Sequence, residues 1–524
     1  MTRKDYGILY LIGLILAAAW ANFQAAPGYM DADYYYLGGV QLAEGKGFWE
    51  NVLWNYLDDP AGLPHPSHAY WMPLASILAA AGIWTAGTST FGAAKIPFVL
   101  LAAGVPVVSA AVGYRLTGRR GLAWLAGLLG LAPGFYASYV TLTETFTLYM
   151  LLGGGILLVG GAGGGEMGWK RAAGLGALAG GMHLARADGI LWLAGCLAWI
   201  VWEGWRARQR GWKIAGQILL AAALYGAVMG VWFGRNLNVF GQWMPPGGSR
   251  ALWITTYDET YSYPAEKLTP ERWLSQGWAN LLGVRWDALK MNLQTVLGVQ
   301  FQIVLLPLAV WGFFRVRQKR EAQIGGLMWL ATLGVMTAVF PFAGSRGGFF
   351  HSGAAVQPLI WGLSAAGLDS AVGWAARKRR WNPQQAVMVL GGGLVMINLA
   401  VSASLYAANV IGEDASQPKW SHSWEDARRT AAQIQAQGGG AQDVVMVNNP
   451  PGYAAANRQP AIAVPNETAV VILGAARRYQ ARWLVLDENV PEPLEVLFLR
   501  PESQTGLRLG YVSKEVVIYE ILPE

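Results

Sequence analysis

The sequence has almost no cysteine and little charge. The single cysteine among 524 residues, Cys196, lies inside an apolar run, so no internal disulfide can form and any exported part must fold without one. Charged residues make up 14% of the chain and hydrophobic residues 54%, gathered in repeated runs near bilayer-spanning length. These runs differ from the alternation of a soluble core, and they indicate a polytopic membrane protein.

Basic residues give the chain a formal charge of +7, which raises the question of nucleic-acid binding. They occur, however, in short clusters between the apolar runs, as expected of cytoplasmic loops. The clusters therefore predict membrane topology and contact with anionic membrane lipids, and they argue against a nucleic-acid partner. They lie at residues 115–120, 170–171, 206–213, 315–320 and 377–380.

The apolar runs predict about eleven transmembrane helices of roughly the length that a bilayer needs. The first has a centre too long for a signal-peptide core, so we expect it to stay uncleaved with the N-terminus in the cytoplasm. The expected spans lie near residues 7–25, 96–114, 121–138, 146–161, 172–187, 189–203, 214–233, 292–314, 323–342, 353–374 and 384–405.

The apolar run 71–87 is expected to lie along the membrane without crossing it. If it crossed, later basic clusters would alternate between the two sides, whereas a non-spanning helix places every cluster in the cytoplasm. The same topology places the polar segments outside. These segments are residues 26–95, 139–145, 187–189, 234–291, 343–352 and everything after Tyr406.

The chain after residue 405 has the pattern of a small α/β domain. Short β-rich runs alternate there with helical patterns, which predicts strands and helices in turn. The strands are expected at 444–447, 483–487 and 516–521, and the helices at 467–479 and 492–498.

Charged and polar residues collect at the outer ends of the expected helices. An acidic residue at membrane depth is costly, so it persists where it meets water, a partner or a substrate. A local ion pair or helix cap explains any one of them, but their origin from at least five loops indicates a shared site. They are Asp31, Asp33, Glu144, Arg186, Asp188, Arg235, Arg346 and His351.

Five short motifs follow one another along the chain: GYMDADYYY, HPSHAYWMPLASIL, LTETFTLYM, LARADGILWL and RNLNVFGQWMP. Their order and spacing resemble the GT-C superfamily of polyprenyl-phosphate-sugar-dependent glycosyltransferases, especially its bacterial protein-mannosyltransferase-like branch. The resemblance implies a helical polytopic membrane fold with membrane-parallel helices in the first outer loop. It also implies a lipid-linked sugar donor. With the topology and the pattern of the tail, we expect a GT-C-like transmembrane catalytic domain over residues 1–405, with 26–95 as that loop, and an extracytoplasmic α/β domain over 406–524.

The sequence departs from the family pattern in two ways. The mannosyltransferase branch typically has adjacent Asp-Glu, whereas this chain has Asp31-Ala32-Asp33, so which carboxylate acts as the base stays open. The Trp-Trp-Asp signature of oligosaccharyltransferase catalytic subunits is missing from the sequence. En bloc transfer of an oligosaccharide to asparagine is therefore not expected.

The reaction can be reasoned from the residue types. A sugar on a polyprenyl phosphate has a leaving group that departs as an anion and needs cationic or hydrogen-bonding stabilisation more than a general acid. We expect Asp31 to take the proton of an acceptor hydroxyl, while Arg186, Arg235 or Arg346 holds the phosphate. Attack opposite the phosphate would invert the anomeric centre.

Further roles are open for the remaining polar residues. Asp33 could orient the acceptor, stay solvated in its loop, or join Asp31 and Glu144 as ligands of Mg²⁺ or Mn²⁺. We expect no obligatory metal, because arginines can neutralise the phosphate. The spacing of His65 and His68 would suit a zinc site, but the neighbouring sequence offers no third and fourth ligand. The family resemblance places His351 near the phosphate. The expected substrate-contacting residues are Glu144, Asp188, His65, His68 and Tyr35, the last of which alternatively belongs to an interfacial aromatic belt.

Two functions of other classes remain. A transporter or lipid-carrier flippase would have buried polar residues and broken helices near the bilayer midplane, whereas these charges cluster at one rim. A scaffold built on the external domain would not need converging charges. The sequence does not identify the sugar, or whether the acceptor is a protein, a lipid or a glycan.

Overall fold

The computed structural model describes residues 1–163 and 165–523, which form two compact units. Each unit is built from three separate segments of the chain. Unit 1 consists of Met1–Phe23, Ile96–Arg235 and Leu282–Ala415, and unit 2 consists of Gln24–Lys95, Asn236–Leu281 and Ser416–Glu524.

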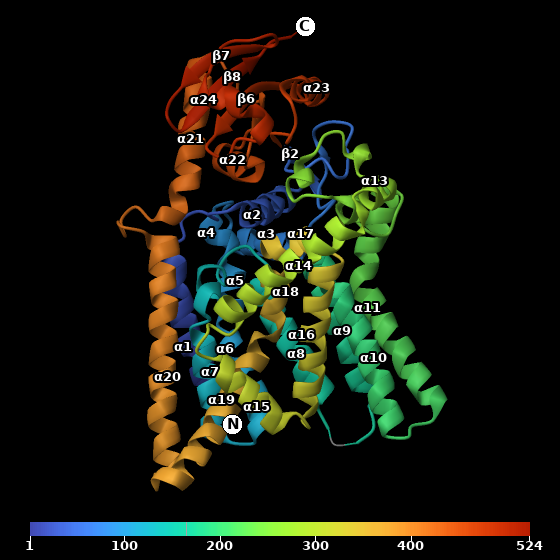
Figure 1. Ribbon diagram of the computed structural model, residues 1–524, viewed down its shortest axis with the longest axis vertical. Helices are drawn as coiled ribbons and strands as arrows, with labels where there is room; N and C mark the ends of the chain where they lie inside the picture. The colour runs from blue at the N-terminus through green and yellow to red at the C-terminus, as the bar shows by residue number, and fades with distance from the viewer. Residues whose placement is uncertain (164, 524) are drawn as a thin grey trace. The chain divides into compact units, whose positions relative to one another are not determined.

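Unit 1 is helical, and helices occur in all eleven regions in which the sequence predicts spans (Figure 1). Two of these helices, α11 and α14, continue for a few residues beyond the unit. The helices are α1 (Arg3–Asn22), α5 (Ile96–Ala102), α6 (Val105–Thr117), α7 (Arg120–Leu131), α8 (Phe146–Gly161), α9 (Trp169–Ala185), α10 (Ile190–Arg206), α11 (Gly211–Phe240), α14 (Gly277–Thr295), α15 (Leu306–Val316), α16 (Arg320–Ala338), α19 (Gln357–Arg379) and α20 (Pro383–Tyr406).

Within the described residues, five helical stretches are long and apolar enough to cross a membrane. A sixth candidate is α16 together with Pro341–Arg379, two helical stretches that bend by 113° at their junction. Pro341 explains the break, because proline lacks the N–H that would continue the helix. Fewer stretches reach this length than the eleven expected, since several apolar helices end early. The five are Arg3–Asn22, Phe91–Thr117, Ala187–Arg206, Gly211–Phe240 and Pro383–Ile411.

The apolar run 71–87 forms helix α3 (Leu74–Ala86) in unit 2. Its 13 residues rise about 20 Å, less than the hydrocarbon core of about 30 Å. By itself the helix is shorter than a bilayer span, as are α7, α8 and α15 of unit 1, so its length does not set it apart from them. Its placement along the membrane stays a prediction.

Ion pairs and hydrogen bonds connect three of the basic clusters of unit 1 to helix ends. Arg115, at the end of α6, donates to Glu321 at the start of α16 over 3.0 Å. The neighbouring Arg320 pairs over 2.8 Å with Glu203, which is buried at the end of α10. Arg171, at the start of α9, donates to carbonyl groups at the end of α8. The predicted topology requires these clusters to share one side of the membrane, and their cytoplasmic location stays a prediction.

Close approach of α15 and α19 depends on glycine. A Cβ atom on Gly312 of α15 would lie 1.9 Å from the carbonyl oxygen of Leu363, and one on Gly367 of α19 would lie 1.8 Å from that of Leu308. Both obstacles are backbone atoms, so the helices would have to separate to admit a side chain. Small residues at such crossings are the usual way in which membrane helices pack.

We expect Gly312→Ala to lower the unfolding temperature of the purified protein in detergent, at a cost of about 1–3 kcal/mol for overpacking. The matched control is Gly334→Ala on α16, where nothing lies within 4 Å of the added Cβ. That control should be neutral or stabilising by up to about 1 kcal/mol, because alanine favours helix. Equal unfolding temperatures for the two variants would contradict the packing argument.

Unit 2 is built on a six-stranded sheet of order β2-β5-β4-β6-β8-β7. The first four strands run parallel, and β8 and β7 close the sheet as antiparallel neighbours. The strands are β2 (Val52–Leu53), β4 (Val444–Val447), β5 (Ala461–Ala463), β6 (Ala481–Asp487), β7 (Leu507–Val512) and β8 (Val516–Ile521).

Helices from the C-terminal segment cover both faces of this sheet. On one face, α21 (His422–Ala436) and α22 (Pro450–Asn457) contribute Ile434 and Tyr453 to the core. On the other, α23 (Ala469–Tyr479) and α24 (Glu495–Leu499) contribute Ile472 and Leu497. These helices and strands β4–β8 are the orange-red to red part of Figure 1. The predicted α/β character of the chain after residue 405 is confirmed.

The units differ from the predicted division at residue 405. Residues 26–95 were grouped with the transmembrane domain, yet they cluster with the C-terminal segment in unit 2. The reason is partly strand β2, whose Val52 pairs with Ala461 of β5. Strand β2 thus joins the first loop to the C-terminal sheet within unit 2, and the side of the membrane on which this unit lies stays a prediction.

Candidate functional site

Asp31 and Asp33 lie in the first turn of α2 (Met30–Ala43), which follows an extended residue, Tyr29. Carboxylates are favoured there because the first turn of a helix presents unpaired N–H groups and the positive end of its dipole. Asp31 is half-buried, whereas Asp33 has no exposed surface. The two acids of GYMDADYYY are thus in different environments although one residue separates them.

Asp33 is held by the C-terminal segment of unit 2. The indole Nε1–H of Trp424 donates to Asp33 Oδ1 over 2.8 Å, and the Asn449 side chain lies beside the same carboxyl group. Burial raises the pKa of Asp33 to about 7, although both hydrogen-bonding neighbours act in the opposite direction. The expectation that Asp33 could be solvated in its loop is wrong, because its carboxyl is packed inside the unit.

This pKa predicts a pH-dependent stability. Between the usual aspartate pKa of 3.8 and about 7, the folded protein keeps a proton on Asp33 that the unfolded chain releases. The free energy of unfolding should therefore fall as pH rises through this range. Above it, Asp33 should cause no further change. Asp33→Asn should abolish the part of the pH dependence that Asp33 causes.

The measurement is tryptophan-monitored unfolding temperature in detergent at about pH 5 and about pH 8, for wild type and Asp33→Asn. Wild type should lose more stability between the two pH values than the variant does. The same pH dependence in both proteins would contradict the buried, protonated state.

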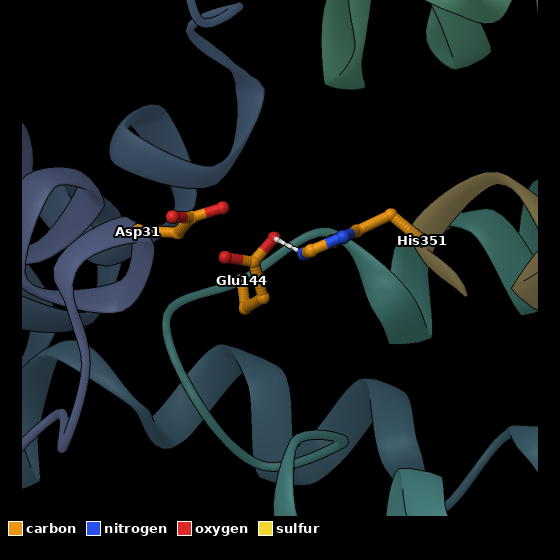
Figure 2. A group of neighbouring side chains, drawn as sticks. All are labelled: Asp31, Glu144 and His351. Atoms are coloured by element: carbon orange, nitrogen blue, oxygen red, sulfur yellow. Dashed lines mark ion pairs between the residues drawn. The ribbon is translucent and has the colours of Figure 1, made fainter. Parts of the chain in front are cut away.

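Glu144 and His351 face one another in unit 1, at the opposite end of the helices from the basic clusters. Figure 2 shows the imidazole directed toward the carboxylate, with His351 Nε2 3.7 Å from Glu144 Oε1. The same Oε1 accepts from the backbone N–H and the hydroxyl of Thr145, over 2.6 and 2.8 Å. Both side chains are buried, with Glu144 1% and His351 8% exposed.

The orientation of His351 is determined by two further contacts. Its Nδ1–H donates over 2.9 Å to the carbonyl oxygen of Gly347, which directs Nε2 toward Glu144. Its ring stacks on Phe146, with centroids 4.2 Å apart. Gly347 has a φ of +128°, a backbone conformation that few other residues adopt. The glycine-rich turn before His351 thus serves to aim the imidazole.

Arg186 and Asp188 form a second pair at this end of unit 1. Arg186 Nε donates to Asp188 Oδ1 over 2.9 Å, and Asp188 Oδ2 accepts over 2.6 Å from the hydroxyl of Ser352, the residue after His351. The guanidinium also lies over the ring of Tyr149, at 5.9 Å from its centroid. The Arg186–Asp188 pair is therefore linked to α18 (Phe349–Gly353), the helix that carries His351.

The other two candidate arginines have different surroundings. Arg235, near the end of α11, lies over the indole ring of Trp232, at 4.8 Å from its centroid. Arg346 is exposed in the break before α18, where its backbone leaves the helical region. Among the three arginines, Arg186 is the one that the described contacts connect to Asp188 and Ser352.

Solved structures with this arrangement of helices are known. The crystal structure of ArnT from Cupriavidus metallidurans bound to undecaprenyl phosphate aligns with a TM-score of 0.59 and 13% identity, over 99% of this chain and 98% of that chain. Its apo state aligns with a TM-score of 0.53, the same identity and the same coverage. The chain has the GT-C fold. No protein-family model and no curated protein matches the sequence.

A third structure of this fold is the arabinofuranosyltransferase AftD from Mycobacteria, determined by electron cryo-microscopy. It aligns with a TM-score of 0.50 and 14% identity over 100% of this chain and 42% of the larger protein. These likenesses confirm the predicted polytopic helical membrane architecture. The predicted roles of individual residues in the GT-C fold stay predictions.

Several of the expected substrate-contacting residues are buried inside unit 2. His68 contacts the hydroxyl groups of Ser67 and Ser76 through its two ring nitrogens, and Tyr35 packs edge-on against Tyr34. His65 instead lies beside the carbonyl oxygen of Val52. The two histidines therefore have different hydrogen-bonding partners.

His65 also lies between two carboxylates of the first loop. Its Nε2 is 3.5 Å from Glu50, and its Nδ1 is 3.6 Å from Asp58. The first contact lies within the two-stranded sheet of β1 (Trp49–Glu50) and β3 (His65–Pro66), and the second ties that sheet to the segment that connects its strands. They account for the burial of His65 without a substrate.

Sequence reasoning missed Ser352 and Trp424. Ser352 is next to His351, but its bond to Asp188 joins residues 164 positions apart. Trp424 is 391 positions from Asp33 and looks like an ordinary core residue of a helix. A local motif cannot reveal either contact, because each partner lies on another part of the chain.

Proposed function

We propose that this chain is an integral-membrane glycosyltransferase that moves a sugar from a polyprenyl-phosphate donor to an acceptor hydroxyl at the outer face of the membrane. The observation that carries the proposal is the GT-C fold, which it shares over almost its whole length with ArnT bound to undecaprenyl phosphate. Two pairs in unit 1 support it, the half-buried Arg186–Asp188 and the buried Glu144–His351, because charged groups at such depth in a membrane bundle are costly without a function.

Arg186 is the proposed holder of the donor phosphate. Its guanidinium is planar and suited to bidentate contact with phosphate oxygens, and the bond from Nε to Asp188 restricts its rotation. Charge on the departing phosphate grows in the transition state, so an oriented guanidinium stabilises that state more than the bound donor. Arg235 and Arg346 are further candidates for the same phosphate.

Asp31 is the proposed general base. Its carboxylate would take the proton from the acceptor hydroxyl as the hydroxyl oxygen forms a bond to the anomeric carbon. The bond from that carbon to the phosphate oxygen breaks at the same time, and its electron pair leaves with the polyprenyl phosphate. Attack from the side opposite the phosphate inverts the anomeric configuration. Half-burial of Asp31 in the first turn of α2 is compatible with substrate access, which full burial denies to Asp33.

Glu144 and His351 are proposed to bind substrate beside the phosphate. Their facing oxygen and nitrogen could contact sugar hydroxyls, and they are also the atom types that bind a divalent cation. We propose that no metal is obligatory, because Arg186 can neutralise phosphate charge. A chelator should then leave the transfer rate unchanged, and a loss that Mg²⁺ or Mn²⁺ restores would overturn this part of the proposal.

The test uses the full chain in liposomes that contain polyprenyl-phosphate-linked sugars, presented as separate pentose, hexose and amino-sugar donors. Lipid extracts are analysed for free polyprenyl phosphate, with empty liposomes as the control. Donor-dependent release in the presence of an acceptor supports the proposal. Movement of intact donor between leaflets without cleavage would indicate the flippase alternative and overturn it.

A binding measurement complements this assay while the sugar is unidentified. Undecaprenyl phosphate and uncharged undecaprenol are compared as ligands that raise the unfolding temperature of the detergent-purified protein. Stabilisation by the phosphate alone supports an isoprenoid-phosphate site. Equal stabilisation by both lipids would contradict it.

A further inference from the structure

Two tryptophans of the C-terminal segment contact the chain on both sides of Asp31. Trp420 contacts the turn that precedes α2, and Trp424 contacts Asp33, two residues after Asp31. All of these residues belong to unit 2. Their separation in sequence is close to 390 positions, so only folding of the C-terminal segment onto the first loop brings them together.

Trp420 contacts the turn closely. Its Nε1–H donates over 2.8 Å to the carbonyl oxygen of Pro27, and its ring meets Tyr29 edge-on with centroids 6.2 Å apart. A Cβ atom on Gly28 would lie 2.0 Å from the indole nitrogen. Gly28 also has a φ of +86°, so glycine is needed here both for the backbone turn and for the approach of the ring.

Trp424 contacts the first turn of the helix itself. Besides its bond to Asp33, its ring packs against Tyr36, one further turn along α2, with centroids 5.9 Å apart. Asp33 is fully buried in this contact. The contact therefore restrains both the axial position and the rotation of α2 at the turn that carries Asp31.

Trp420 and Trp424 belong to one short element. They are four positions apart across the junction of the turn Lys419–Ser421 and α21, and each is 9% exposed. Residues four apart on a helix lie on the same face, so a single element can present both indoles to α2. The chain is thereby contacted before and after Asp31 by one short element of the C-terminal segment.

We propose that Trp420 and Trp424 are positioning residues for the Asp31 carboxylate, and that the C-terminal segment acts in catalysis by holding the first turn of α2. This inference rests on the proposed function, in which Asp31 is the base. Displacement of a catalytic group by about 1 Å can cost about 10²-fold in rate. Hydrogen bonds that restrain its helical turn are therefore expected to affect turnover more than donor binding.

Conservative variants test the proposal. Trp424→Phe and Trp420→Phe keep an aromatic ring but remove the N–H donor, and each should lower kcat by about 10- to 100-fold while KM for the donor changes less than about 3-fold. The matched control is Trp483→Phe, which removes another buried indole N–H from the same segment. Trp483 donates over 3.0 Å to Asp443, a residue outside α2. It should keep wild-type kcat.

A double-mutant cycle separates positioning from general destabilisation. If Trp424 acts through Asp33, then Trp424→Phe combined with Asp33→Ala should lower kcat no further than the more severe single variant. Asp33→Asn keeps an oxygen acceptor for Trp424 and should retain several-fold more activity than Asp33→Ala. Each variant is first checked for unchanged stabilisation by undecaprenyl phosphate, which reports a folded donor site.

The outcomes distinguish this inference from the proposed function. No transfer by the wild-type protein would overturn the proposed function itself. Transfer by the wild type with full kcat in both tryptophan variants, or with the same loss in Trp483→Phe, would overturn the positioning role alone. Additive losses in the double-mutant cycle would also overturn it, because they would show that Trp424 and Asp33 act independently.

Discussion

Asp31→Asn should lower kcat for sugar transfer by about 10²- to 10⁴-fold, the usual contribution of a positioned general base. The amide keeps the size and the hydrogen-bonding oxygen of the side chain but cannot accept a proton from the acceptor hydroxyl. KM for the donor should change little, since this proton is transferred only as the new bond forms. Single-turnover release of polyprenyl phosphate from a labelled donor measures the effect.

Glu44→Gln provides the matched control, because it removes a carboxylate from the residue that ends the same helix. Glu44 pairs with Lys46 and Arg458 at the surface and should be dispensable for transfer. Near-wild-type turnover by Asp31→Asn would mean that Asp31 is not the base. A similar loss in both variants would indicate damage to α2 instead of loss of proton transfer.

Arg186→Ala should weaken donor binding by about 10- to 100-fold, because hydrogen bonds to charged groups contribute about 1.5–3 kcal/mol. Arg186→Lys should recover only part of the loss. A guanidinium can bind Asp188 through Nε and still offer two N–H groups to the phosphate, whereas an ammonium group lacks this bidentate geometry. Ser352→Ala should cause a smaller loss, because it removes one of the bonds that hold Asp188. Binding is measured with undecaprenyl phosphate and with undecaprenol.

The matched control for Arg186 is Arg206→Ala, an exposed arginine at the end of α10 among the basic clusters. It should bind undecaprenyl phosphate as the wild type does. If Arg186→Ala lowers affinity for the phosphate and for the uncharged alcohol equally, the effect is on the lipid chain and Arg186 is not a phosphate ligand. Full recovery by Arg186→Lys would show that charge alone is sufficient.

Elements with a clear local pattern were predicted closely. Strands β4 and β8 occur at the predicted residues, because a short apolar run between polar turns indicates a strand without reference to the rest of the chain. The very short strand β2 was not predicted. Its two residues contain too little pattern, and its partner Ala461 lies some 400 positions away.

The candidate site shows the same division between local and distant information. Arg186 and Asp188 are two positions apart, and their pairing in one turn follows from the Arg-x-Asp-Gly motif. The link from Asp188 to Ser352, by contrast, joins α18 to the turn between α9 and α10. It depends on helix packing that no single motif encodes.

Hydrophobic run lengths, basic clusters and five short motifs were sufficient to identify a helical membrane protein with the GT-C fold and an α/β tail. These features are local, since a bilayer and a strand each impose a pattern on consecutive residues. The tertiary structure decided which acid of the pair in α2 is buried and which is half-exposed. Burial is decided by a partner, here Trp424, and the partner is far away in the chain.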